Sequence, residues 1–379
     1  MADPKVVFSE QAVAEVRALI GKPLRLGQQF NELASADAIC HFAYGYGDTN
    51  PLWNDVAYGR KTRWGAVIAP PTFLSSCIGS MSPSVGFPGA HALWAEDEWT
   101  WRQPVREGDR IRTELYFEDC QRIHQKFADP MYAQTAKFVY HNQSKDVVAE
   151  EFRRTFRFVR HMETKQEGDE QSERDRYGSI APWKYTEEEV KRIYADYDKE
   201  VVRGATPRYF EDVQVGEAMP HVVKGPLTLT DILAWKIGSG FPPFVRAHKM
   251  RVEYERRHPT TAVKNEYGIP DVPERVHWET ELSRVNGIPV PFDYGHQRVS
   301  WLVQVATNWM GDDGFLRNAK LRLRRPNVLT DTCWCRGKVV DKRIDGKDGL
   351  VQCEIWAENQ RNWVTATAQV TIVLPRRSK

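Results

Sequence analysis

The stretch VHWETELSRVNGIPVPFDYGHQR, Val276 to Arg298, places a histidine beside a tryptophan and then, eighteen positions after His277, a glycine ahead of an apolar run. A related stretch lies in the first half of the chain. When Trp53 is aligned with His277, Pro71 falls on Gly295 at the same spacing. Because two fixed points keep one spacing in both halves, we expect an internal repeat.

The repeat extends beyond this stretch. Arg102 and Pro104 match Arg324 and Pro326 at one constant offset. In each half, helical segments precede several strand-like runs that are rich in β-branched and aromatic residues. These runs cover 111–120, 126–142 and 150–159 in the first half, and 333–343, 350–359 and 363–374 in the second. Helices followed by antiparallel strands, twice over, predict an α+β fold.

The most polar segment of the chain, 162–178, separates the two halves. Its many charges and few apolar residues are typical of a linker. Thr186 and Glu189 then form a capping-box pattern at the start of an amphipathic helix. The sequence therefore predicts an N-terminal repeat at 1–160, a charged linker with a connecting helix at 161–205, and a C-terminal repeat at 206–379.

The bulk composition is that of a globular protein, with 41% hydrophobic and 27% charged residues among 379. A net charge of +2 does not suggest a nucleic-acid partner. There is no run of about 18 apolar residues that could span a membrane, and no signal-peptide pattern opens the chain. The six cysteines are scattered, which favours reduced thiols. We expect a cytoplasmic protein, and its 13 Trp and 14 Tyr suggest an aromatic core or a pocket for a bulky apolar ligand.

Three segments carry a family resemblance: GDTNPLWND followed by VIAPPTFL in 47–74, RYFEDVQVGEAMP in 208–220, and LRNAKLRLRRPNVLTDT in 316–332. The first resembles the hydratase motif of the MaoC-like dehydratases, the (R)-specific enoyl-CoA hydratases of hot-dog fold, and the other two resemble further segments of that family. Two copies imply a double hot-dog, in which each repeat has a long central helix wrapped by a curled antiparallel sheet.

Neither copy of the motif is intact. The first keeps Asp48 but has Trp53 at the histidine position, and Pro70 and Pro71 replace the His-Gly pair. Proline has no N–H, so Pro71 cannot donate a hydrogen bond to a thioester oxygen. The second half alone supplies both the histidine and the glycine, so we expect it to be the catalytic repeat.

The resemblance implies reversible addition of water to a 2-enoyl thioester, giving a 3-hydroxyacyl thioester. His277 is then the general acid/base. The N–H of Gly295, at a helix start, is the oxyanion donor, and Tyr294 assists by hydrogen bonding. Strict alignment puts Val272 at the carboxylate position, so Asp271, the nearest acid, is the expected partner of His277.

The expected substrate is an acyl-CoA or an acyl carrier protein thioester, with coenzyme A as part of the substrate and no metal or redox cofactor. Arg322 and Arg324 share one strand face and either hold the phosphates of coenzyme A or form a solvated sheet face. Asp48 either helps to bind substrate or stabilises a turn. His296 is expected to cap or pack its helix. A homodimer through exposed sheets, a hot-dog thioesterase and a catalytically silent acyl-binding subunit remain open.

Overall fold

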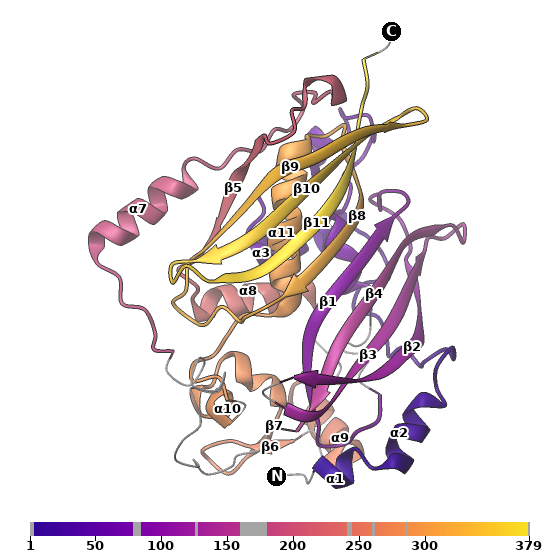
Figure 1. Cartoon of the computed structure of the whole chain (residues 1–379), viewed down its shortest axis with the longest axis vertical. Helices are drawn as coiled ribbons and strands as arrows, with labels where there is room; N and C mark the ends of the chain where they lie inside the picture. The colour runs from indigo at the N-terminus through magenta and orange to yellow at the C-terminus, as the bar shows by residue number, and fades with distance from the viewer. Residues whose placement is uncertain are drawn as a thin grey trace.

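The computed structural model describes residues 4–78, 85–125, 128–159, 180–240, 245–259, 262–285 and 287–377. The polar segment at 162–178 lies outside these residues. The dominant feature is a nine-stranded antiparallel sheet with the order β2-β3-β4-β1-β8-β11-β10-β9-β5 (Figure 1). With helices packed against this sheet, the α+β class predicted from the sequence is confirmed.

Each half of the chain forms its own part of the sheet. The first contributes β1 (His91–Trp101), β2 (Arg112–Gln125), β3 (Ala128–His141) and β4 (Val147–Phe158). The second contributes β5 (Ala218–Lys224), β8 (Phe315–Leu323), β9 (Cys333–Asp345), β10 (Asp348–Asn359) and β11 (Val364–Leu374). The six strand-like runs expected from the sequence all form strands. The halves join where β1 pairs with β8, with Trp99 opposite Ala319.

The centre of the second repeat is α11 (Gly295–Met310), a helix of 16 residues around which β5 and β8–β11 curl (Figure 1). Every residue from His296 to Met310 is buried, as expected of a helix that is enclosed on all sides. The corresponding segment of the first repeat is η1 (Pro71–Ser76), a 3₁₀ helix of six residues that begins at a proline. The long central helix expected in the first repeat is thus seen, within the described residues, only as this short element.

Two further helices, α3 (Ala36–Tyr46) and α8 (Leu229–Ser239), bring the repeats together a second time. They cross at Gly45 and Gly238, where a Cβ on Gly238 would lie 2.3 Å from the carbonyl oxygen of His41. Only glycine allows two helix backbones to approach so closely. The repeats therefore pack through helices as well as through the sheet.

Shorter elements cover the edges of these layers. The connecting helix α7 (Glu187–Tyr197) has the expected capping box of Thr186 and Glu189. In Figure 1, α9, α10, β6 and β7 gather below α11. The remaining elements are α1 (Pro4–Val7), α2 (Glu10–Arg17), α4 (Pro51–Asn54), α5 (Val56–Gly59), η2 (Phe210–Asp212), α9 (His248–Arg257), β6 (Val263–Lys264), β7 (Pro270–Asp271), η4 (Pro273–His277) and α10 (Thr280–Val285).

One apolar core runs through both halves, from Ala34 to Leu374. Trp99, Trp235 and Trp309 are almost completely buried in it, so much of the aromatic content packs the core. All six cysteines are free. Among the described residues, no helix has the length and apolar character needed to cross a membrane.

Candidate active site

The structure brings His277 next to the start of α11. His277 is the last residue of η4, and its ring stacks on that of Tyr294 with 3.7 Å between the ring centroids. Tyr294 is the N-cap residue of α11, and Gly295 is its first helical residue. The ring of Phe292 packs edge-on against His277 at 4.7 Å. An imidazole and the N-terminus of a buried helix therefore share one site.

The hydrogen bonding of His277 defines its tautomer. Its Nδ1 lies 2.8 Å from the carbonyl oxygen of Phe292. Because a carbonyl only accepts, Nδ1 carries the proton and Nε2 keeps a lone pair. Burial lowers the pKa of His277 from 6.5 to about 4, although the nearby Glu274 carboxylate and the Phe292 carbonyl oppose the shift. The ring is therefore neutral at neutral pH, and Nε2 can accept a proton.

Glu274 is the carboxylate that acts on His277. In a 3₁₀ helix, side chains three residues apart eclipse one another, so Glu274 and His277 lie on the same edge of η4. The Lys236 ammonium, 1% exposed, lies 3.0 Å from the Glu274 carboxylate. Burial alone would raise the pKa of Glu274, but Lys236 and His277 outweigh it and lower the pKa. The carboxylate is thus ionised beside the imidazole.

Asp271 takes another position. Its carboxylate accepts a hydrogen bond from the Val272 N–H at 2.7 Å and lies 3.7 Å from Nε of Arg275. Asp271 therefore faces Arg275, and Glu274 is the carboxylate that acts on the pKa of His277. The motif E-x-x-H within PERVH was the available signal, but the alignment drew attention to the Asp of the family motif instead.

Tyr294 lies between His277 and the Lys236–Glu274 pair. The Lys236 ammonium lies 4.6 Å from the Tyr294 ring centroid. Burial, and then the Glu274 carboxylate, raise the pKa of Tyr294 well above its usual value, so the hydroxyl stays protonated. The interaction with Glu274 includes a hydrogen bond between the two side chains, so the Tyr294 hydroxyl donates toward that carboxylate.

Gly295 opens α11 without a side-chain cap from Tyr294. The first N–H groups of a helix have no partner within the helix, and the helix dipole makes this end attractive to negative charge. A Cβ on Gly295 would lie 2.8 Å from Cδ1 of Leu323 and 3.4 Å from Cβ of Trp94. Leu323 and Trp94 thus pack closely against the backbone at this point, and any side chain at position 295 would require Leu323 to move.

The related motif in the first repeat is a folded turn. Asp48 is buried and accepts hydrogen bonds from the Tyr46 hydroxyl at 2.9 Å and the Asn50 N–H at 3.0 Å. Burial raises the pKa of Asp48. Trp53, also buried, stands where the second repeat has His277. These contacts favour the turn-stabilising role of Asp48 over substrate binding.

The two arginines proposed to bind phosphate lie at the end of β8. The Arg322 side chain is 58% exposed, with Nε 3.1 Å from the Glu96 carboxylate on β1. Arg324 is exposed just beyond the last residue of the strand, and its backbone N–H donates to the Thr365 carbonyl at 2.9 Å. The alternation of side chains along β8 therefore ends before Arg324, so the two arginines do not share a strand face. Arg322 already has a carboxylate partner in Glu96.

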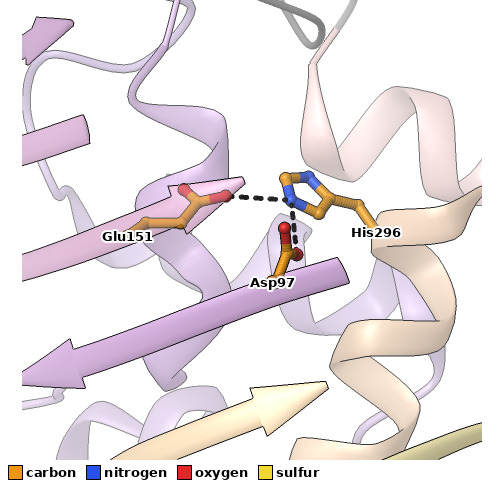
Figure 2. A group of neighbouring side chains, drawn as sticks. All are labelled: Asp97, Glu151 and His296. Carbon is orange, nitrogen blue, oxygen red and sulfur yellow. Dashed lines mark ion pairs between the residues drawn. The ribbon is translucent and has the colours of Figure 1, made fainter. Parts of the chain in front are cut away.

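A second charged group lies in the first turn of α11. Within the described residues, Asp97 on β1, Glu151 on β4 and His296 on α11 form the one set of potential metal ligands (Figure 2). Nε2 of His296 is 3.6 Å from Asp97 and 3.8 Å from Glu151. However, Nη2 of Arg153 is 2.6 Å from Glu151 and 3.2 Å from Nε2 of His296. The guanidinium already binds the atoms that a metal would need, so this group does not fit a metal ion.

Comparisons with known proteins agree with this fold. Residues 18–151 match a family model described as FAS1-like, dehydratase domain region. The UPF0336 protein of Streptomyces avermitilis is 28% identical over 93 residues, which are 23% of this chain and 62% of that protein. The UPF0336 protein of Streptomyces griseus is 32% identical over 81 residues, 20% of this chain and 54% of that protein. The chain thus spans between half and two thirds of the length of these curated relatives.

Solved structures resemble nearly the whole chain. A MaoC-like dehydratase has a TM-score of 0.64 at 16% identity, over 96% of this chain and 100% of that one. A MaoC domain protein dehydratase from Chloroflexus aurantiacus has a TM-score of 0.57 at 12% identity, and the match covers 95% of this chain and 96% of that one. A conserved hypothetical protein from Mycobacterium tuberculosis with a double hot-dog fold has a TM-score of 0.54 at 10% identity, and the match covers 92% of this chain and 95% of that one. The chain therefore has the double hot-dog fold of MaoC-like dehydratases.

Proposed function

We propose that this protein is a hydro-lyase that adds water reversibly to a 2-enoyl thioester, giving a 3-hydroxyacyl thioester. The observation that carries the proposal is the position of a neutral imidazole, His277, against the uncapped start of α11 at Gly295. A base for water and a donor for an oxyanion are the two groups that this reaction needs first.

The geometry suggests how the groups divide the work. Nε2 of His277 accepts a proton from water as the oxygen bonds to C3 of the enoyl group. The electron pair of the double bond moves toward the thioester oxygen, where the Gly295 N–H stabilises the charge. The imidazolium then returns the proton to C2, so the thioester is restored and no proton is lost. The ionised Glu274 stabilises the imidazolium while it exists.

The substrate is proposed to be a thioester of coenzyme A or of an acyl carrier protein. Leu323 flanks Gly295, and its neighbours in sequence, Arg322 and Arg324, are both exposed. A phosphate-bearing group that enters beside Leu323 would meet these two cations. Charge-assisted hydrogen bonds from arginine to phosphate are among the strong ones. A phosphate would compete with Glu96 for Arg322, and we assign Arg322 and Arg324 to the phosphates of the substrate.

The test uses the purified full-length chain with crotonyl-CoA and longer 2-enoyl-CoAs. Loss of the enoyl absorbance, with a 3-hydroxyacyl-CoA as the product and no free thiol, would support the proposal. Release of free thiol would show a thioesterase. Tight binding without turnover of any of these thioesters would show an acyl-binding protein.

Three variants test the assignment of roles. His277→Asn keeps a donor for the Phe292 carbonyl but has no basic nitrogen, so we expect a loss of about 10²- to 10⁴-fold in kcat. Glu274→Gln should also lower kcat, while the matched control Asp271→Asn should stay within about threefold of the wild type, since Asp271 pairs with Arg275. Wild-type rates for the His277 variant would contradict the proposal.

A further inference from the structure

We infer that the first repeat holds the Gly295 amide in place through the side chains of Trp94, Asp97, Glu151, Arg153 and His296, which we call the Arg153 cluster. The inference rests on the proposed function in assigning the oxyanion to Gly295. It makes the members of this cluster positioning residues and the first repeat a working part of the site.

A positioned donor needs fixed neighbours. Groups that stabilise developing charge must be held within about 0.5 Å of their working position. Glycine is the residue with the greatest backbone freedom, and α11 has no side-chain cap to order its first turn. On one side of Gly295, the stacking of Tyr294 on His277 anchors the backbone to the second repeat. The anchor on the other side comes from the first repeat.

That second anchor acts on His296 of α11. Its ring packs against Trp94 of β1 with 3.6 Å between the centroids. Nη2 of Arg153 lies 3.2 Å from Nε2 of His296. The same Nε2 lies 3.6 Å from the Asp97 carboxylate and 3.8 Å from the Glu151 carboxylate, so it faces the guanidinium and both acids. The residue that follows Gly295 is therefore clamped to two strands of the other repeat.

Trp94 contacts both residues of the helix start. It packs on His296, and its Cβ lies 3.4 Å from the position of a Cβ on Gly295. The pairing of β1 with β4 shifts register between Trp94 and Glu96, which marks a β-bulge. Bulges turn a side chain away from its regular direction. The indole is thus aimed at the first turn of α11 by an irregularity in β1.

The charged members of the cluster fix the indole. The Trp94 Nε1–H donates to Asp97 at 2.8 Å, and the Arg153 guanidinium lies 4.0 Å from the Trp94 ring centroid. Glu151 holds Arg153 at 2.6 Å and accepts from the Tyr140 hydroxyl at 2.7 Å. Asp97 and Arg153 thus contact Trp94 directly, and Glu151 and Tyr140 hold Arg153 from within the first repeat.

Stability alone is a weak explanation for this cluster. The side chains of Asp97, Glu151 and Arg153 are fully buried. The desolvation of buried ion pairs can exceed their attraction, and apolar side chains of similar size often stabilise a fold as well or better. The directional hydrogen bonds of a charged cluster instead fix the relative positions of its side chains. Here that geometry ends at the residue beside the proposed oxyanion donor (Figure 2).

The experiment compares Arg153→Met with Arg157→Met. Both arginines are buried on β4 four residues apart, but Arg157 binds the carbonyls of Gly86 and Phe87 within the first repeat. With a 2-enoyl-CoA that the wild type hydrates, we expect Arg153→Met to lower kcat at least tenfold with KM within threefold. An interaction that matters only in the transition state has this signature. Arg157→Met should keep kcat within threefold.

A second readout needs no turnover. In protein labelled with [¹⁵N]glycine and [¹⁵N]histidine, Arg153→Met should shift the Gly295 amide and the Nε2 resonance of His296, and Arg157→Met should leave both in place. Gly295→Ala and His296→Asn assign these signals. If Arg153→Met does not fold, Trp94→Phe decides: it removes the hydrogen bond to Asp97 but keeps an aromatic ring, and it should move the Gly295 amide and lower kcat.

These outcomes separate the two proposals. If the wild type hydrates no enoyl thioester while the Gly295 amide responds to Arg153, the hydratase proposal fails and the anchoring stands. If the wild type is active and the variants at Arg153 and Trp94 match it in kcat and in the Gly295 resonance, the anchoring is overturned.

Discussion

The half-buried imidazole of His277 should make the stability of this protein depend on pH. Its pKa falls from 6.5 to about 4 in the folded state, because burial disfavours the cation. The charged groups that face it are Glu274 of η4, Lys236 of α8 and Arg298 of α11, of which only Glu274 favours the proton. Between pH 6.5 and 4, the unfolded chain binds a proton at this residue and the folded chain does not. The free energy of unfolding therefore falls as the pH falls through this window.

The magnitude follows from the two pKa values. A fall from 6.5 to about 4 corresponds to at most about 3 kcal/mol, since one pKa unit is about 1.4 kcal/mol and the side chain keeps slight contact with solvent. Asp293 opposes this effect. Burial raises its pKa from 3.8 to about 6, so the folded state binds the extra proton and the free energy of unfolding rises as the pH falls. The two effects nearly cancel in the wild type.

The contribution of His277 is therefore measured as a difference. Asp293 is present in both the wild type and His277→Asn, so it drops out when their stabilities are compared at each pH. Relative to the variant, the wild type should lose up to about 2 kcal/mol between pH 7 and pH 4.5, or roughly 3 °C in Tm for 379 residues. Thermal unfolding at several pH values gives the curve. Replacing the exposed His124 by Asn is the control, and parallel curves for the wild type and His277→Asn would refute the reasoning.

Two further predictions concern the packing that supports the site. Gly238→Ala should destabilise the protein by about 1–3 kcal/mol, because its Cβ would lie 2.3 Å from the carbonyl oxygen of His41 on α3. Thermal unfolding should show no such loss for Ile237→Ala, which changes an exposed side chain on the same helix. Thr228→Ala removes the capping box made with Asp231 at the start of α8 and should cost about 1 kcal/mol in urea unfolding. Thr228→Ser should restore the loss, and equal stability of the Ala and Ser variants would count against the cap.

Much of the fold could be predicted because its signals are local. Period-two patterns marked all six strand runs, and the spacing between His277 and Gly295 marked a loop that returns to a helix start. The pairing of β1 with β8 is not local, since residues more than two hundred positions apart meet there. The first central helix also differed from expectation. Pro71 suits the first turn of a helix, and the described residues that follow it form η1.

The sequence predicted as neighbours only those residues of the candidate site that lie in one short segment of the chain. His277, Tyr294 and Gly295 lie within nineteen residues, and the structure brings them together. The partner carboxylate was assigned to Asp271 by distance along the chain, but the 3₁₀ geometry of η4 favours Glu274. Lys236 could not have been predicted, because α8 lies far from η4 in the sequence and reaches it only in the folded protein.

The Arg153 cluster shows the same limit more strongly. Asp97 and Glu151 read as ordinary charges on strands with mixed patterns, and His296 was expected only to cap or pack its helix. These residues come from three separate elements and meet only in the folded protein. No spacing in the sequence predicts that they lie together. A buried ion pair is costly unless each partner is placed accurately. Charged residues inside a sheet face are thus recognisable as one group only after folding.

The two repeats differ in a way that the proposed reaction explains. Proton transfer requires an imidazole at one place, and the second repeat has it in His277, whereas the first has the buried Trp53. Oxyanion stabilisation requires accuracy rather than reactivity, and it can be supplied by any rigid neighbour. The sheet of the first repeat is such a neighbour, because it is hydrogen-bonded to the second through β1 and β8 and reaches α11 through Arg153. In the proposed reaction, a repeat that lacks the histidine can therefore still determine the rate, provided that it keeps the start of α11 in place.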